Sequence, residues 1–66
     1  MDSNVKAKMR IEHWLKHNHS HVAEYESFAL ELDSAGKGES AGYIREMAAL
    51  VTQSNEKLKK ALDTLA

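Results

Sequence analysis

The stretch Ser34-Ala35-Gly36-Lys37-Gly38 decides the fold, because it interrupts an otherwise continuous helical pattern. It holds two of the three glycines, and proline is absent from the 66 residues. The sequence on either side is rich in Ala, Leu, Glu and Lys, which favour helix. We therefore predict an all-α fold with a single domain, residues 1–66. One helix spans about residues 4–35, a loop spans 36–38 and a second helix spans about 39–65, and the two pack as an antiparallel hairpin.

Residues near the predicted helix ends support these boundaries. Asp2, Ser3 or Asn4 could cap the first helix by accepting a hydrogen bond from a free backbone N–H. Gly36 is suited to the left-handed conformation that ends many helices. Glu39 brings a negative charge to the positive end of the second helix dipole.

Apolar residues recur at intervals of three and four, as in helices that pack along one stripe. The first helix has two such rows: Ile11, Asn18, Tyr25, Leu32 and Trp14, His21, Phe28, Ala35. The second helix also has two: Ile44, Val51, Leu58, Leu65 and Met47, Ser54, Ala61. The loop position predicts that the numbers of facing residues sum to about 75 or 76. The predicted pairs include Trp14 with Ala61, Phe28 with Met47, Asn18 with Leu58 and His21 with Ser54, the last two forming a polar layer with Asn55 beside it.

The apolar face is wider than one hairpin can bury. Its flanks hold Leu15, Val22, Ala29, Tyr43, Ala48, Leu50 and Leu62. A second copy would cover them, so we predict a homodimer that forms an antiparallel four-helix bundle. A higher oligomer or a different protein partner is the alternative.

Charge and composition argue against several function classes. The formal net charge is −1, and no basic stripe of useful size predicts nucleic-acid binding. No apolar run approaches the ~18 residues of a membrane span. The first residues lack an apolar signal segment and cysteine is absent, so we expect a cytoplasmic protein. No Ser-His-Asp grouping and no phosphate-binding loop is recognisable, so we do not expect an enzyme.

The four histidines all lie within residues 13–21. His13, His17 and His21 are spaced four apart and share one slanting helical face, and Glu24 falls on the same side. Two imidazoles at this spacing can converge on one metal ion. We predict a transition-metal site of His17 and His21 with His13 or Glu24, for nickel, zinc or copper. His19 lies on the far side and is not included.

Other interpretations of these residues stay open. His21 could be a core histidine bonded to Ser54, since buried polar groups need partners. Asn18 could set the register of the seam, as buried asparagines do in coiled coils. The histidine cluster could also act as a pH switch, because imidazoles become charged near pH 6.

The first helix also resembles a known family. The residues that carry the likeness are His13-Trp14-Leu15-Lys16-His17-Asn18, then His21 and Glu24-Tyr25. They are similar to the pattern His-Trp-x-x-His-Asn-x-x-His-x-x-Glu-aromatic of short prokaryotic and archaeal helical-hairpin domains. The likeness covers nearly the whole chain, although only the first-helix motif is specific. The resemblance implies an association with nickel-handling accessory proteins and a metal-related role for His13, His17, His21 and Glu24.

Two functional hypotheses follow. In the first, the protein is a small dimeric metal-binding hairpin that serves metal homeostasis or delivery without catalysis. In the second, it is a structural or protein-interaction module whose polar layer fixes register and which binds no metal.

Overall fold

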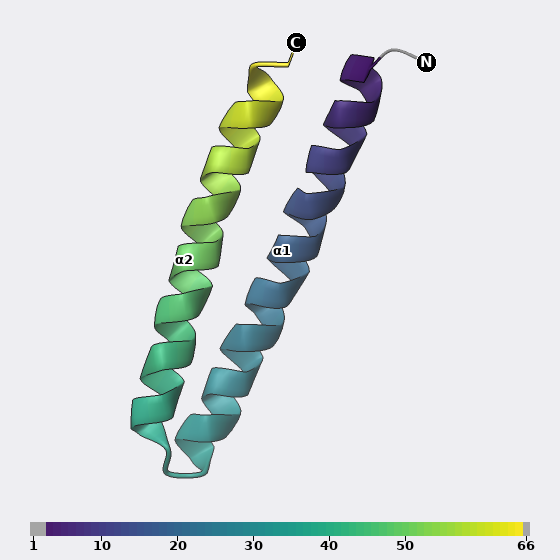
Figure 1. Ribbon diagram of the computed structural model, residues 1–66. Helices are drawn as coiled ribbons and strands as arrows, with labels where there is room; N and C mark the ends of the chain where they lie inside the picture. Colours follow the sequence, from purple (N-terminus) through teal and green to yellow (C-terminus); the bar gives the residue numbers. More distant parts are fainter. Residues whose placement is uncertain (1–2, 66) are drawn as a thin grey trace.

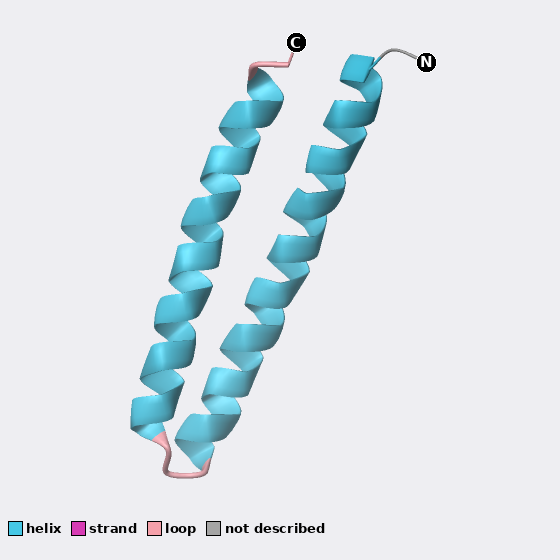
Figure 2. Ribbon diagram, in the orientation of Figure 1, coloured by secondary structure: helices cyan, strands magenta, loops and turns pink. Residues whose placement is uncertain are grey.

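The computed structural model describes residues 3–65, which form two helices packed against each other as an antiparallel hairpin (Figure 1). Helix α1 is Ser3–Ser34 and helix α2 is Gly38–Asp63. Residues 3–65 contain no strand (Figure 2). The molecule is long and thin, with extents of 52 × 16 × 10 Å. No helix within the described residues is long and apolar enough to cross a membrane.

The turn is formed by a helix-ending motif at Gly36. This glycine has φ 76°, a left-handed conformation that costs a residue with a Cβ more than glycine. The Gly36 amide donates to the Asp33 carbonyl at 3.0 Å, and the Lys37 amide donates to the Leu32 carbonyl at 2.8 Å. This pair of bonds is the Schellman arrangement, which satisfies carbonyls left free at the helix end. The predicted role of Gly36 is therefore confirmed.

The other helix ends differ in detail from the expectation. Asp2, one of the three expected caps, lies outside the described residues. Asn4 donates its side-chain amide to the Leu65 carbonyl at 3.1 Å, which links the two ends of the hairpin. Glu39 lies in the first turn of α2, as expected, while Lys37 makes no side-chain capping bond.

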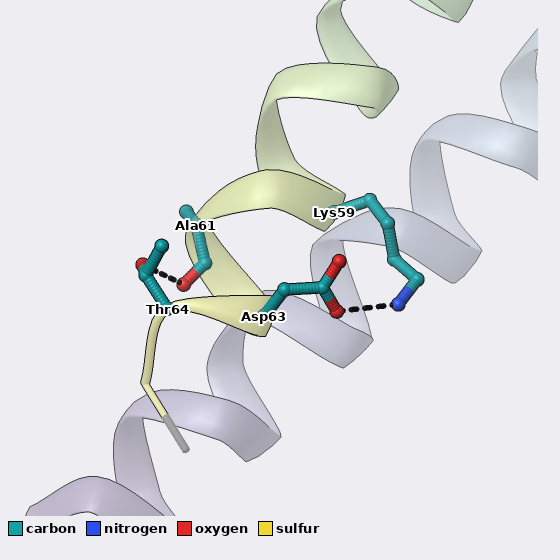
Figure 3. A network of polar contacts seen from close by, with 4 residues as sticks. All are labelled: Lys59, Ala61, Asp63 and Thr64. Carbon is teal, nitrogen blue, oxygen red and sulfur yellow. Dashed lines mark hydrogen bonds and ion pairs between the residues drawn. The ribbon is translucent and has the colours of Figure 1, made fainter.

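Helix α2 ends before residue 64 and its last turn is held by polar contacts (Figure 3). Lys59 and Asp63, four residues apart, form an ion pair at 2.6 Å. The Thr64 hydroxyl donates to the Ala61 carbonyl at 2.8 Å. These contacts satisfy carbonyl and charged groups where the helical ladder stops.

The seam residues of α1 form two rows, of which only the row that begins at Ile11 is the predicted one. Buried and partly buried positions of α1 recur at four and three residues: Ile11, Leu15, Asn18, Val22, Tyr25, Ala29 and Leu32. Those of α2 do the same, and Leu65 beyond its end continues the pattern: Ala41, Ile44, Ala48, Val51, Asn55, Leu58, Leu62 and Leu65. Leu15, Val22 and Ala29, expected on the flank, therefore take the seam positions predicted for Trp14, His21 and Phe28, and His21 lies partly exposed at the edge of the seam.

The physical reason for this rotation is the size of the side chains. Ala29 and Ala41 are fully buried and Ala48 is 4% exposed, whereas Trp14 and Phe28 are each 47% exposed. Small residues allow two helix axes to approach closely. Trp14 and Phe28 in the same positions would hold the axes apart, so the hairpin turns its alanines inward.

The register also differs from the prediction. The Asn18 amide donates to the Asn55 side-chain oxygen at 2.9 Å, so facing residue numbers sum to 73 at this layer, as 18 and 55 do. In this register Tyr25 faces Ala48, so a large side chain lies opposite a small one. Leu58 does not face Asn18, and Ser54 is exposed, so the predicted His21–Ser54 pair is wrong.

The hairpin alone buries little apolar surface. Among the described residues, its buried core consists of three alanines, and no large side chain is fully buried. A surface ion pair joins Asp33 to Arg45 across the two helices near the turn. The hydrogen bond from Arg45 to Asp33 raises the pKa of the guanidinium above its ordinary value. Exposed ion pairs contribute little to stability, so the hairpin depends on its seam.

Candidate metal centre

The centre of the candidate site is the pair His17 and His21, one turn apart on α1. Their Nε2 atoms are 2.9 Å apart, and their ring centroids are 4.3 Å apart at an interplanar angle of 85°. Residues four apart on a helix lie one above the other, which explains the approach. At this distance one Nε2 carries a proton and donates it to the lone pair of the other.

Glu24 lies on the opposite edge of the His21 ring. Its Oε2 is 3.5 Å from His21 Nδ1, and the side chains of His21 and Glu24 are 37% and 69% exposed. A carboxylate beside Nδ1 favours the tautomer with a proton on that nitrogen, which leaves the Nε2 lone pair available. The Tyr25 ring stacks on His21 at 5.9 Å and 11°, so a neighbouring side chain also fixes the ring plane.

His13 approaches the pair only through its ring face. Its centroid is 6.0 Å from that of His17, with the rings nearly parallel at 17°. A stacked ring directs its nitrogen lone pairs within its own plane, so this arrangement does not aim them at the His17–His21 contact. His19 is exposed and lines a depression with Val22, Thr52 and Lys59 on the other side of the hairpin.

The structure thus places the four predicted ligands in different ways. It brings His17 and His21 together through their nitrogens, sets Glu24 beside the second nitrogen of His21, and leaves His13 stacked one turn away. Within residues 3–65, no three or more His, Asp or Glu side chains are grouped so as to hold a metal ion. One chain in this arrangement offers an ion two convergent nitrogens.

The polar layer next to this site has a partner that the sequence did not identify. Asn18 was expected opposite Leu58, yet it bonds to Asn55. The Asn55 amide also points to the Leu15 carbonyl at 3.4 Å, a long contact. Two asparagines at matching seam positions were the available signal, but the predicted register was off by two to three residues, which separated them.

An exposed apolar surface surrounds the histidine pair. Trp14, His21 and Phe28 each follow a seam residue of α1 by three positions, and Met47 follows Ile44 of α2 in the same way. Both helices are right-handed and they run in opposite directions, so these positions lie on the same face of the hairpin. Asp33 and Arg45, which each follow a seam residue by one position, lie on the opposite face. The face that holds His21 is called the histidine face, and it contains Trp14, His17, His21, Phe28, Tyr43, Met47 and Leu50.

Four of the largest exposed apolar side chains lie on the histidine face. Trp14 and Phe28 are 47% exposed, Leu50 is 65% exposed and Tyr43 is 66% exposed. The sequence assigned the first two to the seam, because both flanks of that row are apolar. The histidine pair therefore lies between large exposed apolar side chains, with Trp14 before it and Phe28 after it along α1.

Comparison with known proteins gives a family but no characterised relative. Searches of curated proteins and of solved structures returned no match to this chain. A protein-family model described as "Domain of unknown function (DUF8180)" matches residues 7–65, which include both helices and all four histidines. The chain therefore belongs to this domain family.

Proposed function

We propose that this protein is a small, non-catalytic metal-binding hairpin that holds a transition-metal ion through His17 and His21. The observation that carries the proposal is the 2.9 Å contact between their Nε2 atoms. A cation with bonds of ~2.0–2.1 Å can bind both nitrogens once the donating imidazole carries its proton on Nδ1 instead of Nε2. The carboxylate of Glu24 on the far edge of His21 matches the carboxylate–histidine–metal arrangement found at many metal sites.

The chemistry of the pair suits borderline metal ions. Neutral imidazole binds zinc, copper and nickel. With bonds of ~2.0–2.1 Å, two nitrogens 2.9 Å apart subtend about a right angle, as in square-planar or octahedral nickel or copper. Tetrahedral zinc would need the nitrogens to separate to about 3.4 Å, which rotation of two partly exposed rings allows. The resemblance to nickel-handling accessory proteins adds nickel as the first ion to test.

We further propose that the protein acts in the cytoplasm as a homodimer, in which two hairpins form a four-helix bundle. The histidine face supports this part of the proposal, because it gathers four large exposed apolar side chains, and exposed apolar surface of this kind marks interaction sites. A role in metal homeostasis or delivery fits a chain in which two imidazoles remain accessible. Light scattering tests the assembly, and a stable monomer at high concentration would refute the bundle.

Isothermal titration with nickel, copper and zinc tests metal binding directly. We expect micromolar binding by the natural chain and its loss in His17→Ala/His21→Ala. His19→Ala is the matched control, since it removes an imidazole from the same helix on the other face and should leave binding unchanged. Circular dichroism establishes that each variant is helical. Absence of binding heat for all three ions would refute the proposal.

The second candidate function is a protein-interaction module without metal. The exposed apolar residues of the histidine face favour it independently of the imidazoles. In that case Trp14→Ala and Phe28→Ala would weaken association, while His17→Ala/His21→Ala would leave it intact and no metal would bind.

A further inference from the structure

We infer that the metal centre is shared between two copies of this chain. In this arrangement the histidine faces meet across a two-fold axis near His21, and each copy gives His17 and His21 to one ion. The inference rests on the proposed function, because it takes the histidine pair as ligands. One chain alone does not complete the site, and a second copy supplies the remaining ligands.

The first reason is the number of ligands. Two nitrogens converge within one chain, whereas zinc sites have three or four protein ligands and other imidazole-bound ions also take more than two. Glu24 faces Nδ1 of His21, so it lies on the wrong edge of the ring to join an ion at Nε2. His13 is turned ring face to ring face with His17. A second copy brings two further imidazoles of the same kind.

The second reason is the amount of exposed surface. The chain exposes 5064 Å² at a mass of 7.4 kDa. A compact monomer of this mass exposes about 4,200 Å², so the hairpin exposes about 850 Å² more. A standard protein interface buries about 800 Å² on each partner. The excess therefore equals the area that one stable partner would cover.

The third reason is the spacing of residues along α1. Trp14 and Phe28 lie seven residues before and seven residues after His21. In a two-fold interface, residue i contacts residue j and j contacts i. If α1 pairs antiparallel with its own copy at His21, Trp14 of each chain meets Phe28 of the other.

The charges of α1 agree with the same pairing. Arg10 and Glu31 lie on the flank of α1 that holds His17, at nearly equal distances along the helix from His21. The antiparallel pairing therefore brings Arg10 of each copy close to Glu31 of the other. Opposite charges at the rim of an interface fix its register.

The spacing along α2 fits the same axis independently. In the seam register, Thr52 of α2 lies at the same height along the hairpin as His21, so the axis crosses α2 at this height, although Thr52 itself lies on the opposite face. Residues at equal distances from Thr52 then face each other across the two copies. This places Leu50 opposite Ser54 and Tyr43 opposite Ala61. Each of these pairs matches a large side chain with a small one, as close packing requires.

At the axis the His21 residues of the two copies face each other, and each His17 lies one turn away with its Nε2 2.9 Å from that of its own His21. Four neutral imidazoles suit nickel, copper or zinc, and the charge of the ion is then balanced by Glu24 beside each His21. Trp14 and Phe28 of both copies lie on either side of the site. They would exclude water from it and strengthen the electrostatic interactions there.

The experiment measures stoichiometry and mass together. Nickel, copper and zinc are each titrated into the full chain by calorimetry, and the mass is measured by light scattering with and without the ion. We expect one ion per two chains and a mass of twice 7.4 kDa in the bound state. One ion per chain, whether in a monomer or a dimer, would overturn the sharing but leave metal binding through His17 and His21 standing. No binding at all would overturn both.

A second variant tests the interface without removing a ligand. Trp14→Ala/Phe28→Ala keeps every imidazole, and we expect it to weaken metal binding at least tenfold and to shift the bound protein toward the monomer. Leu30→Ala is the control, because Leu30 is 64% exposed on the opposite face, where it lines a depression with Glu26 and Arg45. Unchanged affinity in the Trp14→Ala/Phe28→Ala protein, with helicity retained, would contradict the shared site.

Discussion

Replacing the seam asparagines tests the register of the hairpin most directly. Asn18 donates to Asn55 at 2.9 Å, a normal distance for a neutral hydrogen bond. Such a bond contributes about 0.5–1.5 kcal/mol net to stability. Removing one of its two groups lowers stability by about 1–3 kcal/mol when the remaining group is buried without a partner. This layer is only partly buried, and the Asn55 contact to the Leu15 carbonyl is long at 3.4 Å. We therefore expect Asn18→Ala to cost about 1 kcal/mol, at the low end of that range.

The assay is a double-mutant cycle with Asn18→Ala, Asn55→Ala and the combined variant, followed by thermal and urea unfolding at one protein concentration without metal. A loss of 1 kcal/mol lowers Tm by about 4–8 °C in a domain of this size. The coupling energy between the two sites should be about 0.5–1.5 kcal/mol. Ser54→Ala, at the exposed neighbour of Asn55, should change stability by less than about 0.5 kcal/mol. Additive effects of the two asparagine changes, within about 0.3 kcal/mol, would show that the register is wrong.

Two further predictions concern the seam and the turn. Leu15→Ala should lower the free energy of unfolding by about 1–2 kcal/mol, less than for a fully buried leucine, while Trp14→Ala should change it by under about 0.5 kcal/mol at concentrations where the chain is monomeric. Urea unfolding measures both free energies, and a larger effect at Trp14 than at Leu15 would show that Trp14 lies in the seam. Gly36→Ala should destabilise by about 1–2 kcal/mol because φ is 76°, whereas Gly42→Ala, whose new methyl group meets no atom within 4 Å apart from the adjacent backbone of its own helix, should stabilise α2 by about 0.5–1 kcal/mol. Equal effects of the two glycine changes on Tm would contradict the proposed role of the turn.

The sequence predicted the two helices and the turn because these depend on local chemistry. The lack of proline and the richness in helix-forming residues leave only the glycine-containing loop as a break. Gly36 takes the left-handed conformation that a glycine after a helical run usually takes. Local preferences of this kind need no knowledge of the partner helix.

The choice of seam could not be made from periodicity alone. Ile11, Asn18, Tyr25 and Leu32 have apolar residues on both sides, so a stripe can be drawn through either Trp14 and Phe28 or Leu15 and Val22. The decision depends on how closely the helices can approach, and therefore on which alanines face each other. Which alanines face each other depends on the register between the two helices, and a shift of two to three residues changes the facing pairs.

The candidate site was only partly accessible from the sequence for a related reason. The approach of His17 to His21 follows from helical spacing, and Glu24 was expected on the same side. Helical spacing could not show that Glu24 lies beside Nδ1 of His21 or that His13 stacks without directing a nitrogen inward. These details depend on side-chain rotamers, which spacing does not determine.

The hydrogen bond from Asn4 to the Leu65 carbonyl brings the first and last turns of the hairpin side by side. A unit whose ends meet can be grafted into a surface loop of a host protein without forcing that loop apart. The graft would project as a rod up to about 50 Å long, since α1 has 32 residues at about 1.5 Å each. Its imidazole pair would then lie near mid-length, well clear of the host surface.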